Sequence, residues 1–327
     1  MVLRGADRLT EGAAALARRM NISEMVIGLT IVAAGTSAPE LFVSVVSALN
    51  GTPDLAVGNV VGSNIMNTLV IVGVTAMVAP IVVSRSTVRK DMPFTAGATL
   101  LLAILCLDGL GSLSLRGNMI SRIDGILLLA AFTMFMVYTF SVVRKGRGGV
   151  SGTEGLDGTS GPIPESDPAE TSQQLPVWKA LLFVALGLAF LIVGSNFFVD
   201  SATSVAAALG VSQSVIGLTI VAGGTSLPEL ATSVVAAKKG QSALAIGNVI
   251  GSNVFNILLI LGLTATICPM QIGGITILDM ATMLVSIAVL WLFSSTKLTV
   301  ERWEGAVLTL GYAAYLAWLL KLAIVPE

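Results

Sequence analysis

The sequence contains no histidine, and this absence narrows the chemistry that the chain can carry. Ser-His and Cys-His catalytic arrangements are excluded, and so is a histidine proton relay. The two cysteines, Cys106 and Cys268, lie in apolar runs and are too few for a disulfide framework or a metal cluster. The sequence therefore gives no sign of an enzyme, and we predict that the chain needs no cofactor.

Charged residues are also scarce, at 11% of the 327 residues. Soluble domains contain roughly 25%, so the surroundings of this chain are not mainly water. The net charge is −1, and no basic patch suggests a nucleic-acid partner. The sequence begins with no cleavable signal peptide, and no feature points to a protein partner. We expect the lipid bilayer to be the main partner of the chain.

What the sequence has instead is apolar length, with 54% apolar residues and a mean hydropathy of +0.90. A helix needs about 20 apolar residues to cross a bilayer, and runs of that length recur along almost the whole chain. We predict an all-α polytopic membrane protein with ten transmembrane helices. Their spans lie near residues 2–19, 22–49, 55–80, 93–111, 123–143, 177–208, 212–237, 243–268, 275–295 and 303–322.

An internal repeat organises these spans. Residues 26–80 align without a gap on residues 215–269, at a constant offset of 189, with 34 identities in 55 positions. The two halves are predicted as residues 1–143 and 177–327, joined by a linker at 144–176. Since each half would hold five spans, an odd number, the halves should be inverted relative to each other, which is an architecture of transporters.

The distribution of basic residues predicts the orientation. With the N-terminus outside, the predicted cytoplasmic loops hold thirteen Lys and Arg residues and the external loops hold two. We expect an inner (plasma) membrane protein with both termini external and the central linker cytoplasmic. By comparison with the second half, the first helix begins in mid-span, so we expect that roughly a dozen residues precede Met1 in the natural chain.

The linker is rich in Gly, Ser, Pro, Thr and acidic residues between Gly146 and Gln174. This composition is typical of a disordered tether. Its carboxylates offer a second interpretation, a regulatory calcium site, but the segment is too short to form a folded regulatory domain.

Two carboxylates, Glu40 and Glu229, occupy equivalent positions deep in apolar spans of the two halves. An ionised side chain at mid-membrane costs about 2.5–3.5 kcal/mol on insertion scales, so such a residue indicates a function. The alternative is a protonated glutamic acid that only bonds two helices together. The matched polar surroundings in both halves favour the functional interpretation.

Those surroundings read GTSAPE at Gly35–Glu40 and GTSLPE at Gly224–Glu229. A proline lacks an N–H and crowds the carbonyl four residues earlier, so Pro39 and Pro228 should break their helices and free backbone oxygens. The hydroxyls before each glutamate should share its helical face. Carboxylate, hydroxyl and carbonyl oxygens together suit hard cations such as Ca²⁺, and soft ligands are missing.

The next span of each half carries a second paired motif, GN-x-x-GSN-x-x-N. In the first half Asn59, Ser63 and Asn67 recur at every fourth position, which predicts one polar stripe on a helix. The paired glycines beside it (Gly58, Gly62, Gly247 and Gly251) are interpreted as close helix contacts. For Ser63, Asn67 and their equivalents Ser252 and Asn256, we favour ion ligation over helix association.

With both motifs present in both halves, the chain resembles the calcium/cation antiporter superfamily, and within it the prokaryotic sodium/calcium exchangers. The resemblance implies a diamond-like set of ion sites between the second, third, seventh and eighth helices. By motif position, it implies that the Ca²⁺ ligands are Glu40, Glu229, Thr36 and Thr225. The Na⁺ ligands implied are Ser37, Ser226, Ser63, Ser252, the carbonyls of Ala33 and Ala222, and Asn67 and Asn256.

The function predicted from these residues is antiport of Na⁺ against Ca²⁺ by alternating access around Glu40 and Glu229. The alternative is a Ca²⁺/H⁺ antiporter that uses the same glutamates. Asparagine at both position 67 and position 256 argues against proton coupling, since some exchangers of this type carry one aspartate there. A passive cation channel and an intramembrane enzyme are weaker alternatives, because the halves are paired and histidine is missing.

Overall fold

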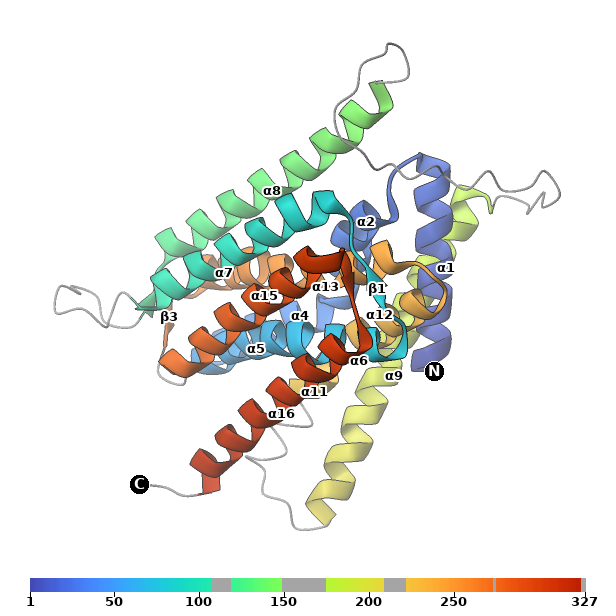
Figure 1. The fold of residues 1–327 in the computed structure, drawn as a ribbon. Coiled ribbons are helices and arrows are strands. Elements are labelled where there is room, and N and C mark those ends of the chain that lie inside the picture. The colour runs from blue at the N-terminus through green and yellow to red at the C-terminus, as the bar shows by residue number, and fades with distance from the viewer. Residues whose placement is uncertain (108–118, 149–174, 209–221, 273–274, 325–327) are drawn as a thin grey trace, which may run out of the picture.

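The structure, a computed structural model, describes residues 1–107, 119–148, 175–208, 222–272 and 275–324. These residues are mostly helical, and Figure 1 shows the helices gathered into one bundle. The helices in chain order are α1 (Val2–Met20), α2 (Glu24–Ile27), α3 (Ala33–Thr36), α4 (Ala38–Leu49), α5 (Pro53–Met66), α6 (Val72–Val78), α7 (Met92–Leu107), α8 (Arg122–Gly148), α9 (Val177–Ala208), α11 (Ala222–Thr225), α12 (Leu227–Lys238), α13 (Ser242–Val254), α14 (Leu261–Ile267), α15 (Ile277–Lys297) and α16 (Arg302–Ile324).

Short π-helical segments join several of these helices into longer runs. They lie at Gly28–Val32, Asn67–Ile71, Thr87–Asp91 and Phe255–Ile260. Two of them, Asn67–Ile71 and Phe255–Ile260, fall at equivalent positions of the sequence repeat, because Asn67 corresponds to Asn256. A π-helical turn widens the helix locally and is frequent at functional sites. The sequence pattern did not predict these turns.

Helices occupy the predicted spans wherever the structure describes them. Residues 212–221 of the seventh predicted span lie outside the described residues. By length and composition, five helical runs of the described residues could cross a membrane, or six if the bent run Glu24–Leu49 is counted as one span. The ten-span arrangement therefore stays a prediction. In the described part of the chain, α8 continues to Gly148, so the predicted linker begins inside this helix. The acidic residues of the linker lie outside the described residues.

Two pairs of very short strands were not predicted. β1 (Ile81–Val82) pairs with β4 (Thr299–Val300), and β2 (Met119–Ile120) pairs with β3 (Met270–Gln271), both antiparallel. Each pair joins one strand of the first half to one of the second. A shift of 189 positions carries β1 onto β3, and a shift of 180 carries β2 onto β4. The two halves are thus joined by two strand pairs that are equivalent under the sequence repeat.

Glycines allow the helices of the two halves to approach each other closely. A Cβ atom built on Gly73 of α6 would lie 2.8 Å from the carbonyl oxygen of Gly305 in α16. The equivalent contact joins α8 and α14, where a Cβ on Gly125 would lie 2.7 Å from the carbonyl oxygen of Gly262. Such distances leave no room for a side chain, as in membrane helix pairs built from small residues.

The centre of the bundle is formed by the helices of the repeated segment. α4, α5, α12 and α13 lie inside it (Figure 1), and 94% of the residues in the most apolar part of Ser242–Ile267, which includes α13, are buried. The outer helices are more exposed, as lipid-facing helices would be. In α8, for example, only 22% of the residues in the most apolar part are buried. Polar residues of the repeated motifs are therefore placed in the interior and not on the lipid-facing surface.

Candidate ion-binding site

Both repeated GTS-x-PE motifs interrupt their helices at the serine. Ser37 has φ −84° and ψ 8°, and Ser226 has φ −88° and ψ 5°, which are outside the α-helical range. Pro39 and Pro228 follow in the first turn of α4 and α12, where a missing N–H costs nothing. The run Glu24–Thr36 and α4 meet at 46°. Each serine is therefore the N-cap of the helix that carries the glutamate.

The two glutamates are buried and are joined by reciprocal hydrogen bonds between the halves. Glu40 is 1% exposed and Glu229 is 0% exposed. Ser37 Oγ donates to Glu229 Oε1 at 3.0 Å, and Ser226 Oγ donates to Glu40 Oε1 at 3.4 Å. Each carboxylate is therefore held by the serine that precedes the other carboxylate. The structure brings these four residues together at one place, where the two broken helices meet.

Asparagines of the second motif hold the backbone of both glutamates. Asn59 Nδ2 donates to the carbonyl oxygen of Glu40 at 3.2 Å and to Ser44 Oγ at 3.0 Å. The equivalent Asn248 Nδ2 donates to the carbonyl oxygen of Glu229 at 3.3 Å and to Ser233 Oγ at 3.0 Å. The repeat is therefore reproduced in the polar contacts around the site.

The sequence interpretation missed this supporting role. It placed Asn59 on a polar stripe but gave it no partner, and it did not consider Ser44 or Ser233. A signal was present, because Ser44 follows Glu40 by four residues and Ser233 follows Glu229 by four. Residues four apart share a helical face.

The threonines and alanines proposed as Ca²⁺ and Na⁺ ligands lie on the helices just before the two breaks. Thr36 is buried, and its Oγ1 lies 3.2 Å from Asn248 Oδ1 and 3.1 Å from the carbonyl oxygen of Val32. The carbonyl oxygen of Ala33 accepts the backbone N–H of Ser37 at 2.9 Å. In the second half, Ala222 and Thr225 form the ends of α11, and Thr225 is half-buried.

The hydroxyl and amide residues of the second motif are all buried. Ser63, Ser252, Asn67 and Asn256 are at most 3% exposed. Asn67 lies at the start of a π-helical turn, and its Nδ2 donates to Asn253 Oδ1 of the other half at 3.1 Å. Asn253 Nδ2 donates in turn to Thr68 Oγ1 at 3.0 Å. This chain of bonds ties α13 to the π-helical turn of the first half.

Several buried oxygens of these residues have no hydrogen-bond partner among the described residues. They are Glu40 Oε2, Glu229 Oε2, Asn67 Oδ1, Asn256 Oδ1 and Ser252 Oγ. Leaving one buried polar group unsatisfied costs about 1–3 kcal/mol, and more if it is charged. Other buried atoms without a partner in the described part of the chain, such as Thr75 Oγ1 and Ser294 Oγ, lie on residues that were not predicted as ligands. The oxygens of the predicted ligands fit a hard cation of the Ca²⁺ or Na⁺ type.

The charged ligands proposed for this site are only the two glutamates. Among the described residues, no three His, Cys, Asp or Glu side chains lie close enough together to hold a metal ion. Two carboxylates with neutral hydroxyl and amide oxygens give fewer charged ligands than tight calcium sites use. Such a site is suited to a cation that binds and leaves.

Glycines of the second motif bring α13 against the broken helix of the first half. A Cβ built on Gly247 would lie 2.8 Å from the carbonyl oxygen of Met25, and one on Gly251 would lie 2.7 Å from Ala33 Cβ. Both glycines therefore form a close helix contact, as interpreted from the sequence. The segment equivalent to Met25–Ala33, which would face Gly58 and Gly62, lies mostly outside the described residues.

Comparisons with known proteins identify the family of the chain. The family described as "Sodium/calcium exchanger protein" matches residues 1–141 and 179–321. The inner membrane protein YrbG of Escherichia coli (strain K12) is 34% identical over 321 residues, which cover 98% of this chain and 93% of YrbG. The sodium/calcium exchanger MaX1 of Methanosarcina acetivorans is 31% identical over 330 residues, which cover 96% of this chain and 94% of MaX1.

Solved structures give the same result for the fold. The sodium-calcium exchanger NCX_Mj, soaked with Na⁺ and Ca²⁺, superposes with a TM-score of 0.77 at 29% sequence identity. The match covers 97% of this chain and 94% of that one. The similarity in fold therefore extends over nearly the whole length of both chains.

Proposed function

Because the chain belongs to the sodium/calcium exchanger family, we propose that it exchanges Na⁺ for Ca²⁺ across the membrane at the oxygen cluster around Glu40 and Glu229. A multi-pass membrane protein that carries out cation antiport agrees with the relatives and with the apolar helices. Transport, rather than catalysis, is the activity of such a family. The Na⁺ coupling and the assignment of the two glutamates are our proposal.

The observation that carries the proposal is the reciprocal bonding of the two carboxylates. One oxygen of each carboxylate is bound by a serine of the other half, and the second oxygen is buried without a partner. The two free oxygens come from opposite halves of the repeat. A cation bound by both would connect the halves directly.

The charge of the site supplies the coupling. Two ionised glutamates give a charge of −2, which one Ca²⁺ or two Na⁺ would neutralise. An empty site would leave two unpaired charges in a buried place, at a cost of several kcal/mol per ion. The protein should therefore switch access from one side of the membrane to the other easily only when the site is occupied. One ion then leaves as the other arrives. A third Na⁺, bound by neutral oxygens, would make exchange electrogenic.

Alternating access would come from movement of α1 and α9 past this central site, as in other transporters built from inverted repeats. We propose ten spans in two inverted halves, with both termini external and the segment between α8 and α9 cytoplasmic. The two equivalent strand pairs and the two equivalent glycine contacts between halves support this arrangement.

One assay tests the proposal against Ca²⁺/H⁺ antiport and against a channel. The purified protein is reconstituted into Na⁺-loaded liposomes, and uptake of Ca²⁺ is measured after dilution into Na⁺-free buffer. We expect saturable uptake that requires internal Na⁺. Uptake that follows a pH gradient and ignores Na⁺ would instead support proton coupling, and unsaturable flux without a counter-ion would indicate a channel.

The same assay tests the glutamates. Glu40→Gln and Glu229→Gln each remove one charge without changing the side-chain size, and each should abolish exchange because the site can no longer balance Ca²⁺. Glu301→Gln is a matched control, since Glu301 lies at the surface and pairs with Lys297 at 2.8 Å. Full exchange by Glu40→Gln or Glu229→Gln would contradict the assignment of the site.

A further inference from the structure

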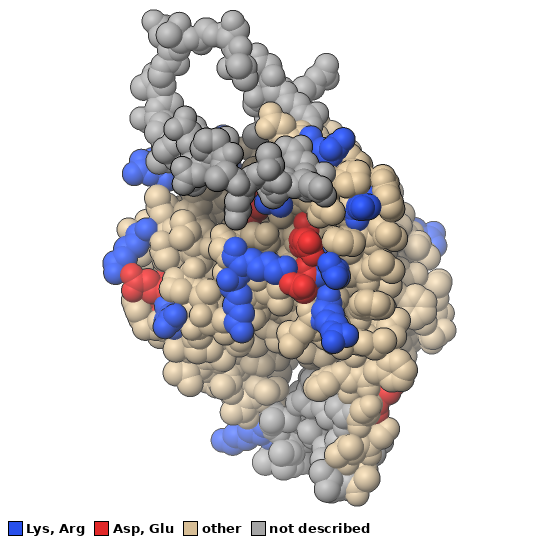
Figure 2. All heavy atoms as spheres, turned by 90° about the vertical axis from the view of Figure 1, so that its right-hand side faces the viewer, with Lys and Arg blue, Asp and Glu red and all other residues tan. Residues whose placement is uncertain are grey.

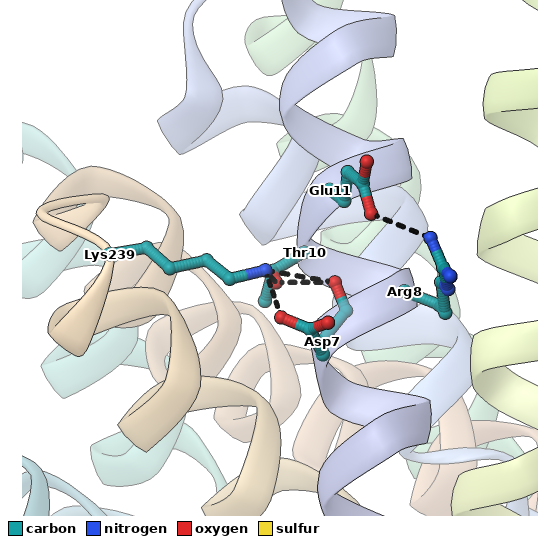
Figure 3. Close-up of polar contacts among 5 residues, drawn as sticks. All are labelled: Asp7, Arg8, Thr10, Glu11 and Lys239. Carbon is teal, nitrogen blue, oxygen red and sulfur yellow. Dashed lines mark hydrogen bonds and ion pairs between the residues drawn. The ribbon is translucent and has the colours of Figure 1, made fainter.

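A second polar cluster connects α1 to the helix that carries Glu229. Lys239 Nζ lies 2.5 Å from Asp7 Oδ1, and it donates to the carbonyl oxygen of Asp7 at 3.0 Å and to Thr10 Oγ1 at 3.1 Å. Figure 3 shows the lysine reaching from the end of α12 across to α1. An ammonium group has three donors, so all of them are used.

This cluster lies at a partly exposed face of the bundle. The side chains of Lys239 and Asp7 are 32% and 53% exposed. Figure 2 shows acidic and basic side chains close together on this face, within a surface that is otherwise mostly uncharged. A second ion pair, Arg8–Glu11 at 3.1 Å, lies on another side of α1 and joins residues of that helix only.

The backbone fixes where Lys239 lies. Lys239 is the C-cap of α12, and its N–H donates to the carbonyl oxygens of Val235 and Ala236, both at 3.1 Å. Gly240 follows with φ +75°, a conformation that favours glycine and ends the helix. The cationic side chain also has a favourable position at a helix C-terminus. The ammonium group is therefore held close to α1 by the end of α12.

α1 and α9 form one packed unit. A Cβ on Gly5 of α1 would lie 2.9 Å from the carbonyl oxygen of Gly187 in α9, and one on Gly12 would lie 2.7 Å from the carbonyl oxygen of Ala180. We expect two helices in backbone contact over this length to move together. Lys239 therefore links the α1–α9 pair, which should move during transport, to α12 in the centre.

The sequence repeat defines what the counterpart of this link would be. A shift of 189 positions relates Asn50 to Lys239, Asp7 to Asn196 and Thr10 to Val199. Asn50 is the C-cap of α4, and Gly51 follows with φ +79°, as Gly240 follows Lys239. The backbone is the same at both places, but the counterpart has neither the cation nor the carboxylate.

The helix packing also differs between the two sides of the repeat. α1 packs along α12, whereas α9 has no comparable contact with α4 within the residues that the structure describes. If the two halves exchange conformations during transport, α9 would pack on α4 in the opposite state. That state would have no ion pair in place of Lys239–Asp7.

We propose that Lys239, Asp7 and Thr10 form a latch that holds the α1–α9 pair against α12 and favours this state over its counterpart. The proposal rests on the proposed function, because only an alternating-access cycle gives the counterpart a meaning. On the predicted orientation Lys239 is cytoplasmic, so the latched state is the one with α1 closed over the cytoplasmic half of α12.

The test measures the two states directly by the distance between two spin labels. The labels are placed at L3C on α1 and A243C on α13, both at exposed positions, with Cys106 and Cys268 replaced by alanine. Lys239→Met removes the charge and keeps the stem. We expect it to raise the population of the second state, relative to the latched state, by up to about fivefold, since an exposed ion pair contributes at most about 1 kcal/mol. High salt should shift the parent protein in the same direction.

Further variants separate the latch from a general loss of packing. Asp7→Asn keeps the side-chain volume and should reproduce the shift even if Lys239→Met folds poorly. The double exchange Asp7→Lys with Lys239→Asp should return the distribution toward that of the parent. Glu11→Gln removes the other ion pair of α1 and should leave the distribution unchanged.

The outcomes distinguish the latch from the proposed function. An unchanged distribution in both Lys239→Met and Asp7→Asn would overturn the latch, and so would an equal shift in Glu11→Gln. The distance measurement needs no transport. A shift in these variants together with absent Na⁺-dependent Ca²⁺ uptake would therefore support the latch and contradict only the assigned exchange.

Discussion

At the residue scale, each glutamate of the site divides its two oxygens between two tasks. Oε1 accepts a serine hydroxyl from the other half, and Oε2 has no partner among the described residues. The serine bond fixes the direction of the carboxylate, so that the second oxygen is held in place without being used. A cation can then bind without a costly rearrangement of its ligands, which is the advantage of a preorganised site.

The paired asparagines at 67 and 256 make the site charge depend only on the glutamates. Replacing Asn256 by aspartate adds a third buried carboxylate, which Ca²⁺ alone cannot neutralise, and a proton should then bind when the pH is low. We expect Asn256→Asp to exchange like the parent at acidic pH and to lose activity as the pH rises. The loss should be at most about tenfold per pH unit, as for one titrating group.

The measurement is Na⁺-driven Ca²⁺ uptake by the variant and the parent over a range of pH, expressed as their ratio. Asn256→Ser is the neutral control, and its ratio to the parent should not depend on pH. A pH-independent ratio for Asn256→Asp would show that position 256 lies outside the electrostatic reach of the cargo.

The sequence predicted the position of both glutamates but not how they are held. Their burial follows from apolar spans and a duplicated motif, which are visible in the sequence. The reciprocal serine bonds are not, because periodicity reports only neighbours on the same helix. The helix break at Ser37 makes this residue the N-cap of α4, and its hydroxyl bonds Glu229 of the other half, a partner that no pattern within one helix could indicate.

At the scale of the helices, backbone contact between glycines determines how closely α13 approaches the broken helix. A Cβ on Gly251 would lie 2.7 Å from Ala33 Cβ and 2.8 Å from Leu29 Cα. Gly251→Ala should therefore separate these helices and destabilise the protein by about 1–3 kcal/mol, as expected for overpacking. Thermal unfolding of the detergent-solubilised protein measures the change.

The matched control is Gly311→Ala in α16, where no described atom beyond the adjacent residues and the backbone of the same helix lies within 4 Å of an added Cβ. This variant should be neutral or more stable by up to about 1 kcal/mol, because alanine favours a helix over glycine. Equal unfolding temperatures for the two variants would contradict the role given to Gly251.

The positions of the helices were also easier to predict from the sequence than the places where they bend or widen. The paired small residues indicated close contacts, and Gly247 and Gly251 do form them. The π-helical turns at Asn67–Ile71 and Phe255–Ile260 have no signal of their own, because a single widened turn hardly changes the apolar periodicity. Strands of two residues, such as β1 and β4, are too short for any alternation to be recognised.

At the scale of the whole molecule, the two halves agree in their backbone and differ in their charges. Equivalent strand pairs, glycine contacts and asparagine bonds appear in both halves. The Lys239–Asp7 pair has no equivalent, because Asn50 and Asn196 occupy the corresponding positions. A symmetric backbone permits two states of similar energy, and asymmetric side chains then set which of them is more populated.

The charge of the transported ions gives the last prediction. Three Na⁺ against one Ca²⁺ would move one net positive charge opposite to Ca²⁺ in each cycle. An inside-positive potential should therefore increase Ca²⁺ accumulation in Na⁺-loaded liposomes, by roughly fiftyfold per 100 mV at equilibrium for one charge. Valinomycin with a K⁺ gradient sets the potential, and Glu40→Gln measures the leak. Exchange of two Na⁺ for one Ca²⁺ moves no net charge, so accumulation that ignores the potential would restrict the Na⁺ sites to the two that neutralise the glutamates.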